Sequence, residues 1–269
     1  MSESDIIART PSARTARSLL ADLKTLGVDT GDTLICHSAM SALGWVAGEA
    51  QAVIAALCDA VGTTGTIVMP AHSGHLSEPS HWQNPPVPTD WIETIRAEMP
   101  AYDPATTPTR GMGVIAEQFR TWPGVRRSLH PTLSFAALGP LAEAVTARQP
   151  LADPLGVDGP LGALYELDAK VLLLGVGFEN CTSLHLAERL AAPLGPREPT
   201  GSPILRKGER VWVGYDAPVL RDNDLLADAG ADYEATGAVR LGRVGSAESR
   251  LLAMRGLVDH ATRLWWETP

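Results

Sequence analysis

The fold is decided by the segment Lys170-Val-Leu-Leu-Leu-Gly-Val-Gly-Phe-Glu-Asn-Cys-Thr-Ser-Leu-His-Leu-Ala-Glu188. Residues 171–174 form a continuous apolar run, as expected for a strand buried on both faces of a sheet, and two glycines end it. Thr182 or Ser183 can cap a following helix, whose apolar positions recur at helical spacing. The segment therefore predicts a strand, a tight turn and a helix, the junction at which α/β proteins usually hold their chemistry.

His185 and Glu188 lie three residues apart, so they share one face of this predicted helix. A carboxylate there can orient the imidazole, and an oriented base is the minimum needed to take a proton from a nucleophile. The more common meaning of this spacing is a solvated surface pair. The position of the pair, after a buried strand and beside the hydroxyl groups of Thr182 and Ser183, favours the catalytic interpretation.

Length, charge and cysteine usage limit the classes of protein that fit the chain. With 269 residues it can bury a large core, and we expect one domain over residues 1–269. The net charge of −9 argues against a nucleic-acid partner, since phosphates require a basic face. We also expect a cytoplasmic protein without membrane contact, because no segment has the character of a bilayer span or a secretory leader. The three dispersed cysteines do not suggest disulfides.

Helical and strand patterns alternate along the chain. The sequence predicts helices around residues 16–26, 53–61, 91–99, 114–119, 141–147 and 184–190, and strands over 33–37, 66–70, 132–138, 171–174, 211–215 and 238–244. A last helix is expected to place Leu251, Met254, Val258, Ala261 and Trp265 on one face. This order predicts an α/β fold: a three-layer α/β/α domain with a central mixed sheet and a C-terminal elaboration.

Two segments depart from this alternation. Residues 71–88 contain four prolines, and long irregular segments inside compact domains are usually functional. Beyond Ala192 the chain becomes rich in proline, glycine and charged residues, so we expect residues 193–245 to form an accessory elaboration folded onto the main layers.

Five ordered blocks carry a resemblance to a known family. They are His37-Ser-Ala-Met-Ser41 with Gly44-Trp-Val46, His81-Trp-Gln-Asn-Pro-Pro-Val-Pro88, Pro108-Thr-Arg-Gly-Met-Gly113, Arg127-Ser-Leu-His-Pro131 with Ser134, and Thr182-Ser-Leu-His-x-Ala-Glu188. Together they resemble the aminoglycoside 3-N-acetyltransferase family, from about residue 16 into the C-terminal region. Five blocks in the right order are far more specific than any one of them.

The resemblance implies transfer of an acetyl group from acetyl-coenzyme A to an amine, without a metal. It implies that two loops hold the coenzyme, His37, Ser38, Ala39, Met40 and Ser41 in one and Arg110, Gly111, Met112, Gly113 and Val114 in the other. His185 is then the general base and Glu188 its support, while the hydroxyl group of Thr182 or a backbone amide stabilises the oxyanion. Relatives commonly carry a second hydroxyl residue at the position of Ala39, so one side-chain contact is missing here if the loop binds through side chains.

A polycationic acceptor requires carboxylates, and a polyanionic coenzyme requires cations. We expect the acceptor to contact His72, Glu78, Asp90 and Glu179, with Asp153, Asp158 and the cluster 222–224 as further acidic candidates. The best cations for the coenzyme are Arg110, Arg126 and Arg127. His130 precedes a proline and is expected to shape that turn, with coenzyme contact as the second possibility. A homodimer is also plausible from the resemblance.

Three other functions fit parts of the sequence. The acceptor can be another amine-bearing metabolite. His72, His75 and His81 lie within ten residues and could bind zinc in a metal-dependent hydrolase, although their spacing is not that of HExxH. A non-catalytic protein that binds a cationic small molecule is the third. A dinucleotide-binding fingerprint, a Walker-type phosphate loop and a GxSxG elbow are all missing from the sequence.

Overall fold

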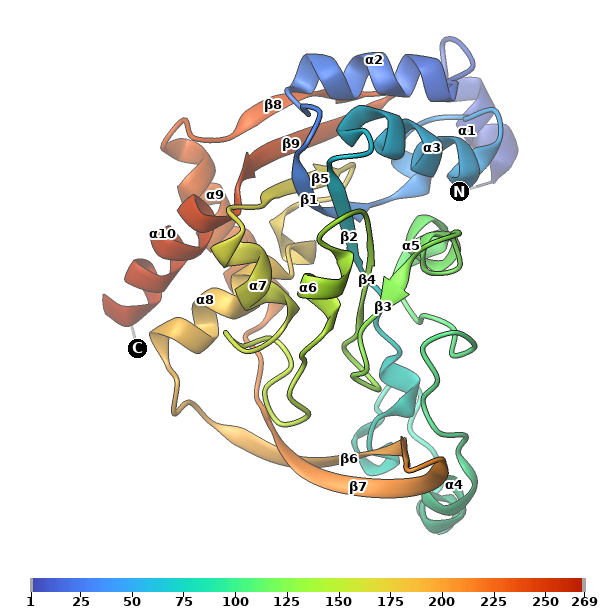
Figure 1. Ribbon diagram of the computed structural model, residues 1–269, viewed down its shortest axis with the longest axis vertical. Coiled ribbons are helices and arrows are strands. Elements are labelled where there is room, and N and C mark those ends of the chain that lie inside the picture. Colours follow the sequence, from blue (N-terminus) through green and yellow to red (C-terminus); the bar gives the residue numbers. More distant parts are fainter. Residues whose placement is uncertain (1, 268–269) are drawn as a thin grey trace.

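A seven-stranded sheet forms the centre of the molecule in the computed structural model, which describes residues 2–267 (Figure 1). The strand order is β3-β4-β2-β1-β5-β9-β8. Their bounds are β1 (Thr33–Ser38), β2 (Thr66–Pro70), β3 (Arg126–Arg127), β4 (Phe135–Leu138), β5 (Lys170–Leu174), β8 (Arg240–Val244) and β9 (Ala247–Ala253). The central pairs β1–β2 and β1–β5 are parallel and the outer pairs are antiparallel, so the sheet is mixed as predicted.

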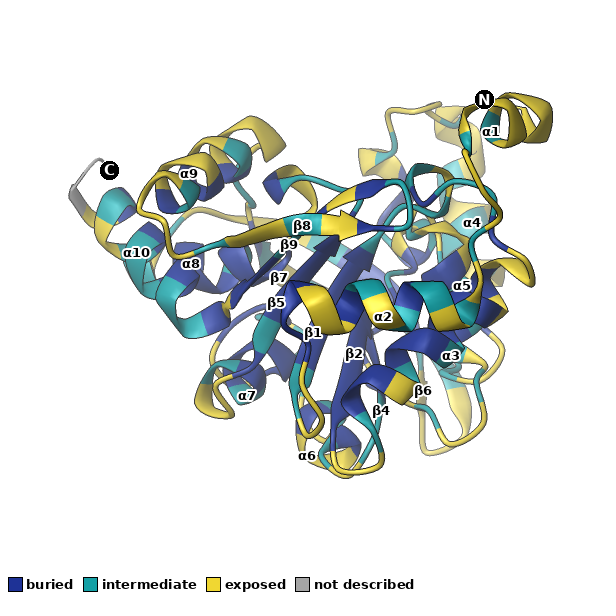
Figure 2. Ribbon diagram, turned by 90° about the horizontal axis from the view of Figure 1, so that it is seen from above, coloured by how far each residue is buried: buried dark blue, intermediate teal, exposed yellow. Residues whose placement is uncertain are grey.

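Helices cover both faces of this sheet. One core joins the sheet to α2 (Ala16–Leu26), α3 (Glu49–Val61) and α5 (Gly113–Arg120). The opposite core joins it to α6 (Ala142–Thr146), α7 (Pro160–Glu166), α8 (Ser183–Ala191), α9 (Asn223–Ala235) and α10 (Met254–Glu267). Figure 2 shows the buried strands between these layers, with the outer face of α2 exposed. The three-layer α/β/α prediction is therefore confirmed.

The central strands owe their burial to uninterrupted apolar sequence. Val171–Leu174 is less than 2% exposed throughout, and β2 is buried at every residue. α2 ends where predicted, because Gly27 takes the left-handed conformation (φ 107°) that closes a helix. Thr182 occupies the N-cap of α8, but its side chain makes no capping hydrogen bond, contrary to the sequence-based expectation. Its hydroxyl group is therefore free for another role.

The C-terminal third differs from the prediction in three places. Only β6 (Arg197–Arg206) and β7 (Glu209–Pro218) form a separate sheet, whereas α9 and β8 belong to the main body, so the accessory segment predicted over 193–245 is too long. The acidic run at 222–224 opens the unpredicted helix α9. Leu251 lies in strand β9, paired with Leu172 of β5, and not on the last helix. Tertiary pairing overrode a helical spacing that continued into α10.

The ribbon of β6 and β7 extends beside the segment that contains α4 (Ile92–Glu98), far from α2 (Figure 1). Arg210 of β7 donates to the carbonyl oxygen atoms of Met99 and Arg96, and the Tyr102 amide donates to the Pro203 carbonyl at 3.0 Å. These contacts connect the ribbon to the chain that follows the irregular segment 71–88. The remaining helix, α1 (Glu3–Arg9), lies near the loop that follows β1, where the Trp45 indole donates to Glu3 at 3.1 Å.

One smaller prediction also changed. The strand predicted over 132–138 begins only at Phe135, because residues 131–133 form a turn. Cys36, Cys58 and Cys181 are free thiols, and the first and last are buried. None of the helices described over residues 2–267 is both long and apolar enough to cross a membrane.

Candidate active site

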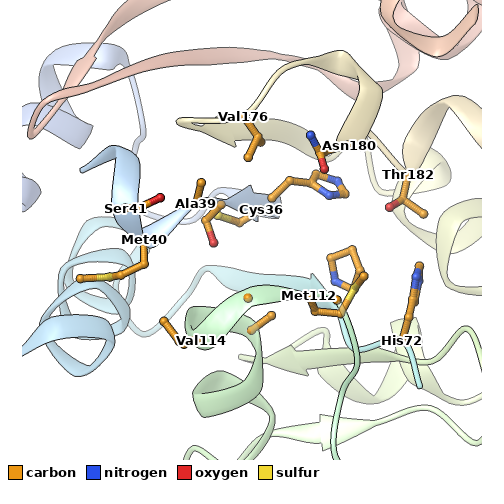
Figure 3. Close-up of a pocket in the computed structure, with 16 residues that line it drawn as sticks. Cys36, Ala39, Met40, Ser41, His72, Met112, Val114, Val176, Asn180 and Thr182 are labelled. Atoms are coloured by element: carbon orange, nitrogen blue, oxygen red, sulfur yellow. The ribbon is translucent and has the colours of Figure 1, made fainter. Parts of the chain in front are cut away.

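A cavity of about 460 Å³ opens at the carboxyl ends of the three parallel strands β1, β2 and β5 (Figure 3). Open α/β sheets bind ligands at this edge, where the chain leaves the strands. The predicted coenzyme residues that line it are His37, Ser38, Ala39, Met40, Ser41, Gly111, Met112, Gly113 and Val114. Thr182 and His72 line the same cavity. Nine of these eleven residues come from two segments far apart in the sequence, the end of β1 with the loop after it and the turn that opens α5, and the fold brings them together.

The two glycine-containing loops face each other across the cavity. The loop after β1 is fixed to β5, since the Ala39 amide donates to the Leu174 carbonyl at 3.0 Å. Gly113 has φ +80°, and a Cβ atom there would lie 3.7 Å from the Ser38 carbonyl oxygen. That distance would be an ordinary van der Waals contact, so the left-handed backbone and not lack of space favours glycine at the start of α5. The two loops form a cleft with an apolar wall at Met40, Met112 and Val114, of which Val114 is 58% exposed.

Glu117 holds the second loop in place and was not identified from the sequence. Its carboxylate accepts from the Thr109 amide and hydroxyl, both at 2.7 Å, and pairs with Arg120. Burial raises the pKa of Glu117, but these hydrogen bonds outweigh it and bring the pKa to about 2. The Arg110 amide also donates to the His72 carbonyl at 2.8 Å. The turn is thus attached at two points before it enters the cleft.

His185 and Glu188 form the predicted pair on α8. The imidazole Nδ1 lies 3.0 Å from Glu188 Oε1, which also accepts from the Arg221 amide at 3.3 Å. Glu188 is buried, whereas the His185 side chain is 15% exposed. His185 does not line the cavity, whereas His37 and His72 do. Its proximity to both residues shows in their pKa values, which its charge helps to lower. The carboxylate orients a reachable base next to the cavity.

Thr182 and His72 lie at the same end of the cavity, with Met40, Ser41 and Val114 at the other end (Figure 3). Burial lowers the pKa of His72 to about 3, with His185, His37, His130 and Arg127 adding to the effect. His130 shapes the turn that follows it, because Nδ1 accepts from the Leu133 amide at 3.0 Å. The predicted turn role of His130 is confirmed.

The acidic residues predicted to meet the acceptor have different surroundings. Glu78 is buried and pairs with Arg96 at 2.7 Å. Burial raises its pKa, but the bonds from Arg96 and Ser80 hold that pKa below its usual range. This carboxylate is already paired with a protein cation, which makes Glu78 a weaker candidate for the acceptor contact than an unpaired carboxylate. Asp90 is exposed in the short turn before α4.

Glu179 fits an acceptor contact better. It is exposed, and it accepts from the Asn180 side chain, which lines the cavity. Asp153 is 3.1 Å from Arg189, and Asp158 is 3.4 Å from Arg148. Glu179 therefore lies beside a residue that lines the cavity, and it has no arginine partner among the ion pairs of residues 2–267.

The three arginines predicted to bind the coenzyme lie in different parts of the structure. Arg127 is buried, and it donates to the carbonyl oxygen atoms of Ala71 and Thr107 and to the Ser134 hydroxyl. These bonds hold the guanidinium group in the interior, which makes Arg127 a weaker candidate than an exposed arginine for the coenzyme phosphates. Arg126 pairs with Glu143 at 3.4 Å on another surface. Arg110 is exposed and lines a neighbouring cavity of about 400 Å³ with His75 and His81.

The fold does not support a zinc site at the three histidines of the irregular segment. His72 lines the main cavity, whereas His75 and His81 line the neighbouring one. Over residues 2–267, no group of three or more histidine, cysteine or acidic side chains is placed to hold a metal ion. The metal-dependent hydrolase therefore lacks its ligand set.

The sequence did not identify some cavity residues, such as Val176 and Asn180 after β5 and Pro70 at the end of β2. The available signal was positional: they follow the carboxyl ends of strands that the sequence predicted. Chemically, the site combines a carboxylate-oriented base, a cleft between two glycine loops and a free hydroxyl group. This combination is typical of α/β enzymes that catalyse group transfer, in which a base and an oxyanion donor are required.

Comparison with known proteins identifies the family. The family model described as aminoglycoside 3-N-acetyltransferase matches residues 35–265. The chain is 44% identical over 259 residues to the aminoglycoside N(3')-acetyltransferase-like protein YokD of Bacillus subtilis, covering 96% of this chain and 94% of that protein. It is 39% identical to aminoglycoside N(3)-acetyltransferase VII of Streptomyces paromomycinus, covering 99% and 96%. The chain belongs to the aminoglycoside 3-N-acetyltransferase family.

Solved structures agree with this assignment. The crystal structure of YokD superposes with a TM-score of 0.96 at 43% identity and covers 98% of both chains. The structure of AAC-IIIb in a binary complex with CoASH has a TM-score of 0.85 at 32% identity, covering 96% of this chain and 99% of that one.

Proposed function

We propose that this protein transfers the acetyl group of acetyl-coenzyme A to the 3-amino group of an aminoglycoside, and so confers resistance to the antibiotic. Family membership supports an acetyl-coenzyme A-dependent N3-acetyltransferase, and a relative of similar fold binds CoASH. The observation that carries the proposal is the His185–Glu188 pair beside a cleft between two glycine loops. This family assignment replaces the hypothesis of a non-catalytic binding protein.

The cleft suits the pantetheine arm of the coenzyme. Its walls are apolar at Met40, Met112 and Val114. The thioester then lies at the end marked by Thr182 and His72, closest to α8. Arg110, exposed at the border of the second cavity, is the predicted coenzyme cation that remains available for the phosphates.

Transfer requires an acceptor amine in its unprotonated form. The free amine attacks, and His185 takes the proton that its nitrogen loses as the C–N bond forms, while Glu188 holds Nδ1 and leaves Nε2 as the basic nitrogen. The amine nitrogen attacks the thioester carbon directly, and the hydroxyl group of Thr182 faces the oxyanion. Collapse of the tetrahedral intermediate breaks the C–S bond and releases coenzyme A, whose sulfur receives the proton. No acyl-enzyme is formed.

A second acceptor class deserves a direct test. Glu78, Asp153 and Asp158 are paired with arginines, which leaves fewer free carboxylates for a polycation than the sequence suggested. Another amine-bearing metabolite is therefore the alternative acceptor.

The test is a free-thiol assay with acetyl-coenzyme A and a panel of aminoglycosides and simple amines, together with His185→Ala. We expect thiol release with an aminoglycoside, and a loss of about 10² to 10⁴ in kcat for the variant, as for removal of a general base. Near wild-type turnover of a folded His185→Ala protein would remove His185 from the mechanism. Activity only with non-aminoglycoside amines would select the alternative.

Location and assembly follow from the same proposal. Acetyl-coenzyme A and reduced thiols both point to the cytoplasm, and the three cysteines of the described chain are free. We propose a homodimer as the working assembly, which sedimentation at micromolar concentration tests directly.

A further inference from the structure

Three imidazoles meet beside the main cavity, and the mechanism above uses only one. His37 belongs to β1, His72 follows β2, and His185 lies on α8. Only His185 has a carboxylate partner among the described residues. The Nε2 atoms of His37 and His72 are buried and have no hydrogen-bond partner within residues 2–267.

The ring of His72 is positioned without hydrogen bonds. It packs edge-on against Phe135, with ring centroids 5.6 Å apart and an interplanar angle of 84°. Its backbone carbonyl is held by the Arg110 amide at 2.8 Å. Figure 3 shows His72 pointing from the cavity wall toward the space beneath Thr182. The ring therefore has a fixed direction and an unused nitrogen.

Electrostatics keep this ring neutral at physiological pH. Burial is the largest cause that lowers the pKa of His72 to about 3, and the neighbouring His185 and His37 lower it further. A base this weak does not deprotonate an amine at neutral pH. A neutral imidazole still carries one N–H donor, and a buried donor without a partner favours a ligand that offers an acceptor.

We propose that His72 donates a hydrogen bond from Nε2 to the carbonyl oxygen of the acetyl thioester. This inference rests on the proposed function. The acceptor nitrogen forms a bond to the carbonyl carbon, and the π electrons of C=O move to the oxygen that His72 contacts. Re-formation of C=O then breaks the C–S bond and expels the thiolate. The amine proton passes through His185 to sulfur, and His72 keeps its own proton throughout.

This role differs in its kinetics from the acceptor contact predicted from sequence. A donor to the oxyanion acts in the transition state and lowers kcat when it is removed, whereas an acceptor contact changes the KM for the amine. Removing one oxyanion donor typically costs about 10² to 10³ in kcat.

Three substitutions separate the ring nitrogens. His72→Gln places an amide N–H near the position of Nε2, His72→Asn places one near Nδ1, and His72→Leu has no donor. We expect His72→Gln to stay within about tenfold of the wild-type kcat, and His72→Asn and His72→Leu to lose about 10² to 10³, with both KM values within about threefold. The matched control is His260→Gln on α10, a histidine that lies outside both cavities, which should leave kcat unchanged within about twofold.

A spectroscopic measurement reads the same bond without any acceptor amine. The carbonyl stretch of ¹³C-labelled acetyl-coenzyme A bound to the wild type or to His72→Gln should lie at lower frequency than when bound to His72→Asn or His72→Leu. Equal frequencies in all four proteins would overturn the inference, as would a loss confined to the KM of the amine. If the wild type releases no thiol with any amine, the proposed function fails, and the carbonyl frequencies still decide whether His72 contacts the thioester. Circular dichroism and coenzyme A binding confirm that each variant is folded.

Discussion

At the scale of single residues, the surroundings of Glu188 determine what His185 can do. The Glu188 carboxylate is buried, lies in hydrogen-bond contact with His185 Nδ1 at 3.0 Å and accepts a hydrogen bond from the Arg221 amide at 3.3 Å. An acceptor fixed in this way favours the tautomer with the proton on Nδ1. The other nitrogen then has a free lone pair for the acceptor amine.

Glu188→Gln tests this orienting role. The substituted amide keeps the size of the side chain but removes the charge that stabilises the imidazolium and can present a donor to Nδ1, which favours the wrong tautomer. We expect kcat to fall by about 10² to 10⁴, with the KM for acetyl-coenzyme A nearly unchanged. Glu166→Gln, an exposed residue at the end of α7, is the matched control. Equal kcat values for the two variants in the thiol assay would contradict the role.

The sequence identified the residues whose contacts are local. His185 and Glu188 share a helix face, and the His37–Ser41 block follows a strand, so short-range pattern placed both near the site. The interior role of Arg127 could not be inferred from local sequence. Its partners, Ala71 and Thr107, lie 56 and 20 residues away in the chain, and only the folded structure shows that they surround the guanidinium group.

At the scale of elements, the prediction succeeded where one pattern had one meaning. The apolar run of β5 and the amphipathic pattern of α8 gave the correct strand, turn and helix. Strand β9 was not predicted, because its buried residues, including Leu251, also continue the helical spacing of α10. Pairing with β5 decides in favour of the strand. Helix α9 was not predicted, because its acidic first residues resemble a solvated loop unless the buried face of the helix is known.

Gly230 shows how packing reverses a propensity within α9. On helix propensity alone, Gly230→Ala should stabilise the protein by about 1 kcal/mol. However, a Cβ atom at this buried position would lie 2.0 Å from Phe178 Cγ, in the turn that precedes α8. We therefore expect the free energy of unfolding to fall by about 1 to 3 kcal/mol, as in other overpacked cores.

Urea denaturation of Gly230→Ala beside Asp228→Ala measures this effect. Asp228 is exposed on the same helix, so its substitution should change stability by less than about 0.5 kcal/mol. An alanine at 230 that leaves stability equal or higher would show that α9 shifts freely from the Phe178 turn.

At the scale of the whole molecule, one sheet edge gathers the chemistry and thereby buries several histidines. The parallel strands β1, β2 and β5 end together, and His37 near the end of β1 and His72 after β2 line the cavity at that edge. His130 enters the same region from the turn before β4 and is 2% exposed. The architecture that creates the site therefore also makes the fold sensitive to acid.

The sign of this sensitivity follows from the pKa values. Burial, aided by His185, lowers the pKa of His37 to about 3, and burial lowers that of His130 to about 4, although its bond to the Leu151 carbonyl opposes this. In the unfolded chain both titrate near about 6.5. Below that pH the unfolded state binds protons that the folded state does not, so stability falls as the pH decreases from about 6.5 toward 4. Each such histidine contributes a slope of about 1.4 kcal/mol per pH unit.

His130→Asn isolates one of these contributions. The asparagine oxygen can replace Nδ1 as acceptor for the Leu133 amide, bonded at 3.0 Å in the wild type, but it does not titrate. Between pH 6 and 4.5, we expect the free energy of unfolding of the variant, measured in urea, to fall less steeply by about 1.4 kcal/mol per pH unit, whatever its stability at pH 7.5. Glu117 does not interfere, because its low pKa produces loss of stability only as the pH falls below about 4.5. Identical slopes for the two proteins would mean that His130 is protonated in the folded state, and that the turn before β4 opens to accept the charge.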